Sequence, residues 1–145
     1  MTTTYCDADD VVDQLDEAVL IQLTDDEDAG VVNTARVERA INDAEALIDS
    51  YCGGKYTVPF ETVPAIIRKY AVDIAIYSLY ARRQGAPEDR KTRYDEAVAF
   101  LKDVAAGKVT LGVQPAPDAR AESTHDAVQS SVRDKIFDED TMDKY

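Results

Sequence analysis

The middle of the chain has apolar residues at every third or fourth position, which is the spacing of helices with one buried face. The clearest helix is predicted to follow Asn33, a good N-cap, and to stop at Cys52-Gly53-Gly54. Its apolar stripe consists of Val37, Ala40, Ile41, Ala44, Leu47, Ile48 and Tyr51. Another helix is predicted from Pro64, and because its apolar residues cover more than one face, we expect it to be the central helix.

Three further helices complete the predicted bundle. Residues 7–15 and 16–24 each predict a short helix, and a longer helix is predicted from Pro87 to Gly107. Residues 108–113 predict a short extended piece at the C-terminal end of this domain. The fold class is therefore all-α, with four to five helices in a domain that spans residues 1–113.

The composition changes at residue 114, and we call residues 114–145 the arm. The arm is rich in Pro, Ala, Ser and Asp and contains eight acidic and four basic residues. Val128, Val132 and Ile136 lie four residues apart, which permits a weak amphipathic helix. Because the arm lacks the apolar residues for a core of its own, we expect a partner surface to order it.

The charge of the chain narrows its class of function. With 29 acidic and 16 basic residues the formal charge is −13, so neutralising the phosphates of DNA is excluded as a main activity. Asp outnumbers Glu, and Lys is scarce, which is typical of proteins that work in molar salt, where charges are screened within ~3 Å. A halophilic source is therefore a hypothesis.

Acidic and basic residues are also separated along the chain. Residues 1–35 contain ten carboxylates and no Lys or Arg, whereas residues 64–93 contain seven basic and three acidic residues. These charges either form pairs within one subunit or suit a head-to-tail contact between subunits, and such a contact, repeated with closure, makes a ring. The residues that we predict at or near subunit contacts are Asp9, Asp10, Asp13, Arg82, Arg83, Arg90 and Arg93.

No residue pattern predicts catalysis, a metal site or a cofactor, and we expect the protein not to be an enzyme. Cys6 and Cys52 lack the spacing of a zinc site, and we expect them to be reduced thiols in or near the core. His125 is predicted to be a solvated loop residue. No stretch has the length of a membrane span, and the start of the chain lacks the basic residues of a secretion signal, so we expect a soluble protein that is not exported.

The acidic loop at residues 25–33 partly matches a calcium-binding EF-hand loop. The match fails because Ala29 takes the fifth position and Arg36 takes the twelfth, where the bidentate Glu is required. The loop is therefore interpreted as a solvated acidic turn, in which Gly30 supplies a left-handed conformation.

A set of short segments occurs along the chain in a characteristic order and spacing. The segments are Tyr5-Cys6 before a short helix, residues 20–25, residues 40–51, Tyr56-Thr57-Val58-Pro59, Val63-Pro64, residues 73–83 and residues 93–112. Together they resemble the Mu-like prophage head-tail connector family of tailed viruses over residues 4–113, with the arm outside the pattern. One departure is Cys52-Gly53-Gly54, where the family more often has bulkier residues.

The resemblance implies a connector-type bundle that acts as a structural adaptor of the virion neck. Such adaptors are homo-oligomers, related in fold to connectors that form a twelve-subunit ring beneath the portal, complete the head after DNA packaging, and dock the next neck or tail-completion protein. They are assembled in the host cytoplasm. The resemblance also implies that the arm engages the portal protein, and the arm residues that we expect to do so are Val128, Val132, Ile136 and Phe137. With the acidic composition, the virus is expected to infect a halophilic archaeon.

Two other classes of function stay open. One is a regulatory, antirepressor-like module of a provirus, which would be a free monomer or dimer. The other is a single-stranded nucleic-acid binder that uses Tyr70, Tyr77 and Tyr80 beside Arg82 and Arg83. We prefer core and interface packing for these tyrosines, because they share a helix with many apolar residues. We therefore expect neither a specific nucleic acid nor a membrane as a partner.

Overall fold

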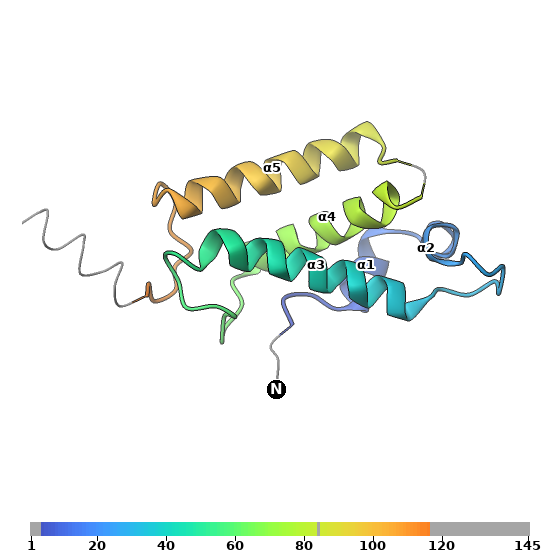
Figure 1. The fold of residues 1–145 in the computed structure, drawn as a ribbon, viewed down its shortest axis with the longest axis horizontal. Helices are drawn as coiled ribbons and strands as arrows, with labels where there is room; N and C mark the ends of the chain where they lie inside the picture. Colours follow the sequence, from blue (N-terminus) through green and yellow to red (C-terminus); the bar gives the residue numbers. More distant parts are fainter. Residues whose placement is uncertain (1–3, 84, 117–145) are drawn as a thin grey trace, which may run out of the picture.

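The computed structural model describes residues 4–83 and 85–116, and within these ranges it contains helices and no strands. The predicted all-α fold is therefore confirmed (Figure 1). The helices are α1 (Ala8–Gln14), α2 (Glu17–Thr24), α3 (Thr34–Cys52), α4 (Ala65–Ala81) and α5 (Glu88–Ala105).

The helix boundaries follow the local signals in the sequence. The Asn33 side chain accepts a hydrogen bond from the backbone N–H of Arg36 and caps α3 as predicted. Helices α4 and α5 begin directly after Pro64 and Pro87, whose fixed φ suits the start of a helix. Helix α1 begins with a capping box in which Asp7 and Asp10 each accept a backbone N–H from the other.

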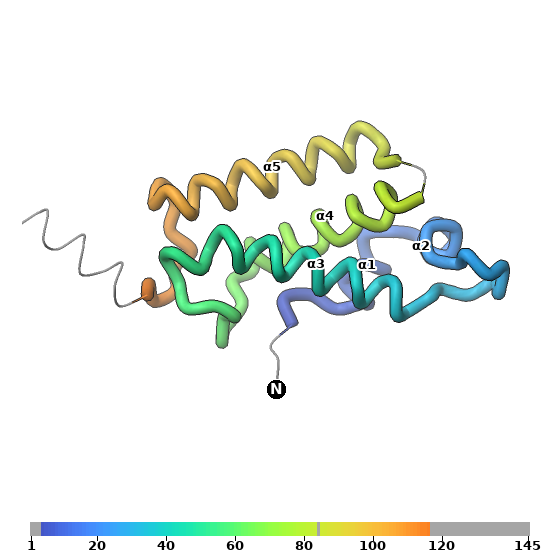
Figure 2. Tube along the Cα trace, in the orientation of Figure 1, coloured from blue at the N-terminus to red at the C-terminus, as the bar shows by residue number. Residues whose placement is uncertain are grey.

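Helix α4 is the centre of the bundle, as its apolar pattern predicts. Its buried residues face every direction, and it packs against all four other helices. Figure 2 shows α3, α4 and α5 running side by side in alternating directions, with α3 and α5 diverging towards the end of the bundle where α2 lies. Helices α1 and α2 complete the core by packing on both α3 and α4.

The N-terminal segment is fastened to α3 through Tyr5, which is buried. The backbone N–H of Tyr5 donates to Glu45 Oε1 at 2.6 Å, and its hydroxyl donates to the carboxylate of Asp49. The same hydroxyl accepts a hydrogen bond from the backbone N–H of Phe60 at 3.2 Å. Burial raises the pKa of Glu45 above its usual range, and burial likewise raises the pKa of Tyr5. One side chain therefore joins the start of the chain, α3 and the loop that follows α3.

The segment after α5 differs from the predicted extended piece. Gly107 adopts a positive φ of 76° after the helix, and the residues that follow form turns and bends. The strand-like pairing of this part of the chain is a single antiparallel bridge between Tyr56 and Pro115, supported by a hydrogen bond from the Ala116 N–H to the Lys55 carbonyl at 2.8 Å. Because a bridge needs a partner strand, the local sequence alone does not reveal it.

In the described ranges, none of the helices is long and apolar enough to cross a membrane.

Replacing Tyr5 with Phe tests its hydroxyl. The variant keeps the ring but leaves the Phe60 N–H without its acceptor and the Asp49 carboxylate without its donor. We expect Tyr5→Phe to lower the free energy of unfolding by about 1–3 kcal/mol, measured by urea denaturation. Tyr80→Phe is the matched control, because the Tyr80 hydroxyl makes no hydrogen bond to the described residues, and an equal loss in both variants would contradict the assignment.

Candidate functional site

The residues predicted at subunit contacts lie in three parts of the bundle. Asp9, Asp10 and Asp13 are on α1, Arg82 and Arg83 follow the last turn of α4, and Arg90 and Arg93 are in the first half of α5. These residues therefore lie at or near two different sites, one at the end of α4 and one between α1, α4 and α5.

The first site is a cluster of Asp26 with Arg36, Arg82 and Arg83, which we call the Asp26 cluster. Arg82 binds the Asp26 carboxylate through two nitrogens, Arg83 Nη1 lies 3.2 Å from Oδ1, and Arg36 Nη2 lies 3.3 Å from Oδ2. Arg36 also forms a two-pronged pair with Glu27, at 2.7 and 2.9 Å. Arg82 and Arg83 thus make their ion pairs within one subunit, which is the alternative that the sequence left open.

The same arginines satisfy the C-terminal end of α2. Arg36 donates to the Thr24 carbonyl at 2.8 Å, Arg82 to the Leu23 carbonyl at 2.8 Å, and Arg83 to the Gln22 carbonyl at 2.9 Å. The last carbonyls of a helix have no partner within the helix and carry partial negative charge, so three guanidinium groups stabilise this end. The cluster therefore connects α2 to the start of α3 and to the end of α4.

The Asp26 cluster also sets the ionisation of its carboxylates. The hydrogen bond from Arg82 holds the pKa of Asp26 below its usual value of 3.8, and the hydrogen bond from Arg36 lowers the pKa of Glu27 in the same way. Both groups are consequently ionised at neutral pH.

The acidic loop after α2 is held in shape by hydrogen bonds from its own backbone to an Asp side chain. The Asp25 carboxylate accepts hydrogen bonds from the N–H groups of Ala29 and Gly30, at 2.9 and 2.7 Å. Gly30 has a φ of 75°, which confirms the predicted left-handed conformation. In the part of the chain that the structure describes, no group of three or more His, Cys, Asp or Glu residues is placed to hold a metal ion.

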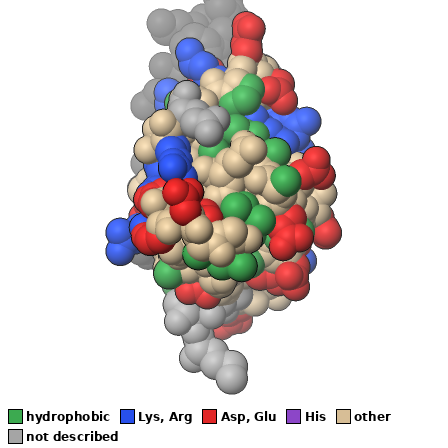
Figure 3. Space-filling model, turned by 90° about the vertical axis from the view of Figure 1, so that its right-hand side faces the viewer, with side chains coloured by type: hydrophobic (Ala, Val, Ile, Leu, Met, Phe, Trp, Pro, Cys, Tyr) green, Lys and Arg blue, Asp and Glu red, His purple; other side chains and the backbone are tan. Residues whose placement is uncertain are grey.

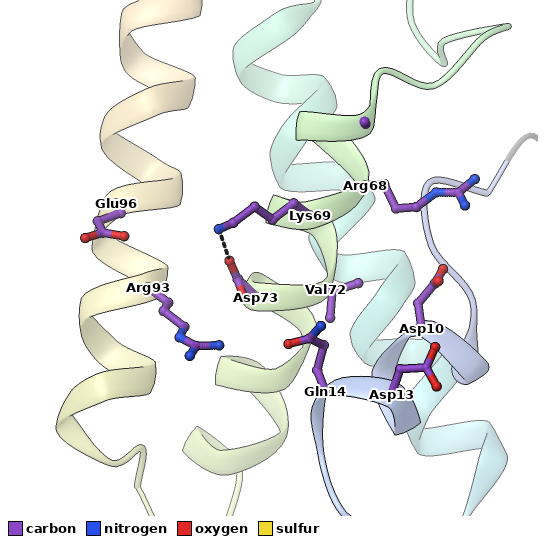
Figure 4. Close-up of a pocket in the computed structure, with 10 residues that line it drawn as sticks. Asp10, Asp13, Gln14, Arg68, Lys69, Val72, Asp73, Arg93 and Glu96 are labelled. Atoms are coloured by element: carbon purple, nitrogen blue, oxygen red, sulfur yellow. Dashed lines mark hydrogen bonds and ion pairs between the residues drawn. The ribbon is translucent and has the colours of Figure 1, made fainter.

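The second site is a groove of about 640 Å³ between α1, α4 and α5. It brings together three of the predicted contact residues, Asp10 and Asp13 from α1 and Arg93 from α5 (Figure 4). Lys69 and Asp73 of α4 form an ion pair of 3.0 Å inside the groove. The groove is lined by Asp10, Asp13, Gln14, Ala65, Arg68, Lys69, Val72, Asp73, Arg93 and Glu96.

Several charges of the groove have no ion-pair partner within 4 Å among residues 4–83 and 85–116. They include Asp13 of α1, Arg68 of α4 and Arg93 of α5. Arg90 lies nearby and donates to the Gln14 carbonyl at 3.1 Å, so it connects α5 to the end of α1 within the subunit. Arg68 was not among the residues predicted at subunit contacts, although it belongs to the basic segment of residues 64–93 and could have been chosen on that ground.

The tyrosines of α4 pack against α5. The rings of Tyr77 and Tyr94 are stacked with centroids 4.1 Å apart, and Tyr70 lies 4.9 Å from Phe100. This arrangement agrees with the packing role that we preferred over stacking on nucleic-acid bases.

Both cysteines are buried and free, as predicted. Burial raises the pKa of Cys6 to about 12 and that of Cys52 to about 11. Both are therefore protonated thiols at neutral pH, a form that is unreactive as a nucleophile.

His125 and the predicted portal-binding residues of the arm, Val128, Val132, Ile136 and Phe137, lie outside the described residues.

The described part of the chain is a bundle of five helices, and its charged groove and its internally paired arginine cluster both lie at the surface. Residues 5–130 match the family described as Bacteriophage Mu, Gp36, and the chain belongs to this family. It is 32% identical over 128 residues to the Mu-like prophage FluMu protein gp36 of Haemophilus influenzae, covering 88% of this chain and 89% of that protein. It is 28% identical over 108 residues to gene product J of Escherichia phage Mu, covering 74% of each.

These comparisons confirm that the chain is a Mu-like phage protein, and they indicate a structural or morphogenesis role. The family match extends beyond residue 113, where the resemblance seen in the sequence ended. The first part of the arm therefore belongs to the family pattern, although the arm has few of the apolar residues on which such patterns are easiest to recognise.

Replacing Asp26 with Asn tests the Asp26 cluster. The variant leaves three arginines without their shared carboxylate charge, so we expect a lower urea midpoint than wild type at pH 7. Because the pKa of Asp26 is lowered in the folded state, its stabilising contribution is present above pH 3.8 and is lost as the pH falls through the lowered pKa. The difference between the proteins should therefore disappear in acid.

Asp28→Asn is the matched control for this measurement. Asp28 is exposed in the same loop, makes no ion pair within the described ranges, and has a positive φ that Asn tolerates. A midpoint for Asp26→Asn that equals the midpoint of this control at pH 7 would show that the cluster does not stabilise the fold.

Proposed function

We propose that this protein is a head-tail connector, or adaptor, of a Mu-like tailed virus. In this proposal its subunits form a ring, twelve in number by analogy with related connectors, beneath the portal protein. The ring completes the head and docks the next neck or tail-completion protein. Membership of the Mu Gp36 family supports a structural role in the virion, and the proposal adds the place of the protein at the neck.

The observation that carries the proposal is the set of charges that remains after pairing within the subunit. Arg82 and Arg83 are occupied by Asp26, whereas Asp9 and Asp13 on α1 form no ion pair with any described residue. The acidic N-terminal part of one subunit therefore suits a basic surface of the next, and Arg93 is one basic residue available for such a contact. A repeated head-to-tail contact makes a ring when the rotation between subunits closes, and the proposal is that it does so here.

The arm supplies the second part of the proposal. The first residues of the arm are held to the loop after α3 by the bridge between Tyr56 and Pro115 and by the hydrogen bond from the Ala116 N–H to the Lys55 carbonyl, so the arm starts at a defined place on the bundle. Its sequence offers Val128, Val132, Ile136 and Phe137 for binding a partner, and the partner that we propose is the portal protein.

The proposed role requires no catalysis and no cofactor. The protein would assemble in the host cytoplasm and remain in the virion neck. The acidic, Asp-rich composition supports a halophilic, archaeal host for the virus, because molar salt screens the self-repulsion of a chain with a formal charge of −13.

Removing residues 117–145 tests the role of the arm. We expect the shortened chain to keep its helical circular dichroism and cooperative unfolding, because the described core lies within residues 4–116. It should no longer bind the portal protein of the same virus in sedimentation or pull-down experiments. The full chain with Val128→Asp and Ile136→Asp is the matched variant, and it should lose portal binding as well. Normal portal binding by the shortened chain, or no binding by the full chain, would overturn the proposal.

A further inference from the structure

The seam between α3 and α4 contains a small pocket of about 280 Å³, which we call the arginine pocket. Ala40 and Leu79 are buried and form an apolar floor, and Arg36, Arg39 and Arg82 supply a basic rim. The pocket lies between the first half of α3 and the end of α4. Asp43 and Ser78 complete its lining.

Arg39 is the arginine of this rim that is free to bind a carboxylate from another molecule. Arg36 and Arg82 are held by Asp26 and Glu27, so their guanidinium groups are fixed in place. Arg39 is exposed and forms neither an ion pair nor a hydrogen bond with the side chains that the structure describes. Because Arg36 and Arg82 are already paired and Asp43 of the lining is acidic, Arg39 is the charge that can bind a new carboxylate. The pocket therefore fits an apolar side chain with a carboxylate beside it that faces Arg39.

Helix α1 presents a group of that kind on its outer side. Val12 is 43% exposed, and it is one of two large hydrophobic residues that are exposed among the described positions. Asp9 lies one turn before Val12 on the same side of α1, and Asp13 follows it. Both carboxylates are exposed, and neither has an ion-pair partner in residues 4–83 and 85–116. Val12 is therefore an apolar knob within an acidic surface.

The knob and the pocket of one subunit lie on different sides of α3, so they cannot meet each other. Asp43 lines the pocket, whereas Glu45 binds the N-terminal segment that leads into α1. Residues two apart on a helix point about 200° apart, and the buried Ala44 lies between them. Figure 3, seen from the end of the bundle, shows Asp and Glu side chains along most of the right-hand edge below a group of Lys and Arg side chains, and acidic and basic side chains together at the left.

We infer that the arginine pocket is the docking site for Val12 of a second copy of this chain. Val12 would lie over the floor formed by Ala40 and Leu79, and Asp9 would face Arg39. This inference rests on the proposed ring and identifies the residues of its head-to-tail contact. Because each subunit has one knob and one pocket on separate sides, the contact repeats from subunit to subunit.

The test measures the mass of the purified full chain by analytical ultracentrifugation over a range of concentrations. Wild type should form oligomers, and Val12→Asp and Arg39→Glu should each raise the dissociation constant by about tenfold or more. All the changed side chains are exposed, and circular dichroism verifies that each variant is folded. Val31→Asp is the matched control, because Val31 is the other exposed large hydrophobic residue and should be replaceable without effect.

Two combinations test the pairing itself. Asp9→Arg alone should weaken assembly as Arg39→Glu does, and the double variant Asp9→Arg with Arg39→Glu restores opposite charges across the contact and should recover the assembly. A mixture of Val12→Asp and Arg39→Glu chains retains one intact knob and one intact pocket per pair, so it should form heterodimers that do not grow further.

A wild-type chain that stays monomeric, variants that assemble like wild type, or a double variant that does not recover would each overturn the inference. These outcomes are separate from failure of the proposed function, which the binding of the full chain to portal reports. A chain that binds portal through its arm while the variants at residues 12 and 39 assemble normally would retain the connector role and exclude this contact.

Discussion

Burial of α4 on every side is the constraint on which the rest of the structure depends. Its apolar residues face all directions, so the helix is stable only when other elements cover each face. Each Val or Leu that is fully removed from water contributes about 1.5–3 kcal/mol, so burial of Val11 in α1 and of Leu20 and Leu23 in α2 explains why helices of seven and eight residues persist although they are marginal alone. Helices α1 and α2 cover apolar faces of α4 that would otherwise be exposed to water. Because α4 is packed against all four other helices, Arg82 and Arg83 at its end have fixed positions.

The acidic start of the chain is divided into two parts with different electrostatic environments. The part after α2 is neutralised within the subunit, because Asp26 and Glu27 bind arginines from α3 and α4. The part on α1 has no such partners among the described residues. The first part therefore contributes to folding, and the second remains available at the surface. A count of charges along the sequence cannot distinguish the two, because the pairing depends on which helix ends meet in space.

Local features of the sequence predicted more of the fold than of the site. Asn33, Pro64 and Pro87 act within one turn of their own positions, so they located the starts of three helices. The bonds of Tyr5 to Glu45, Asp49 and Phe60 join residues that are 40 or more positions apart, and no local signal reveals them. The same holds for Arg36, which was noted only as a mismatch in a calcium-loop pattern and proves to support the end of α2. Charge segregation was visible in the sequence, but the division of arginines between internal pairs and free surface required the structure.

Two mechanisms reduce the repulsion between the carboxylates of α1, namely screening by salt and binding to a second subunit. The two lead to different physical expectations. Screening by molar salt acts on every exposed carboxylate alike and needs no particular arrangement of side chains. Binding to a second subunit requires that the carboxylates surround an apolar group and that the opposing arginines surround an apolar floor, because desolvation of the charges must be offset by burial elsewhere in the contact. Val12 among the aspartates of α1, and Ala40 and Leu79 among the arginines of the pocket, provide that combination. Exposure of Val12 does not by itself separate the two mechanisms, because Val31 is more exposed and has no such role; the position of Val12 between the carboxylates of Asp9 and Asp13 is what favours a contact between subunits.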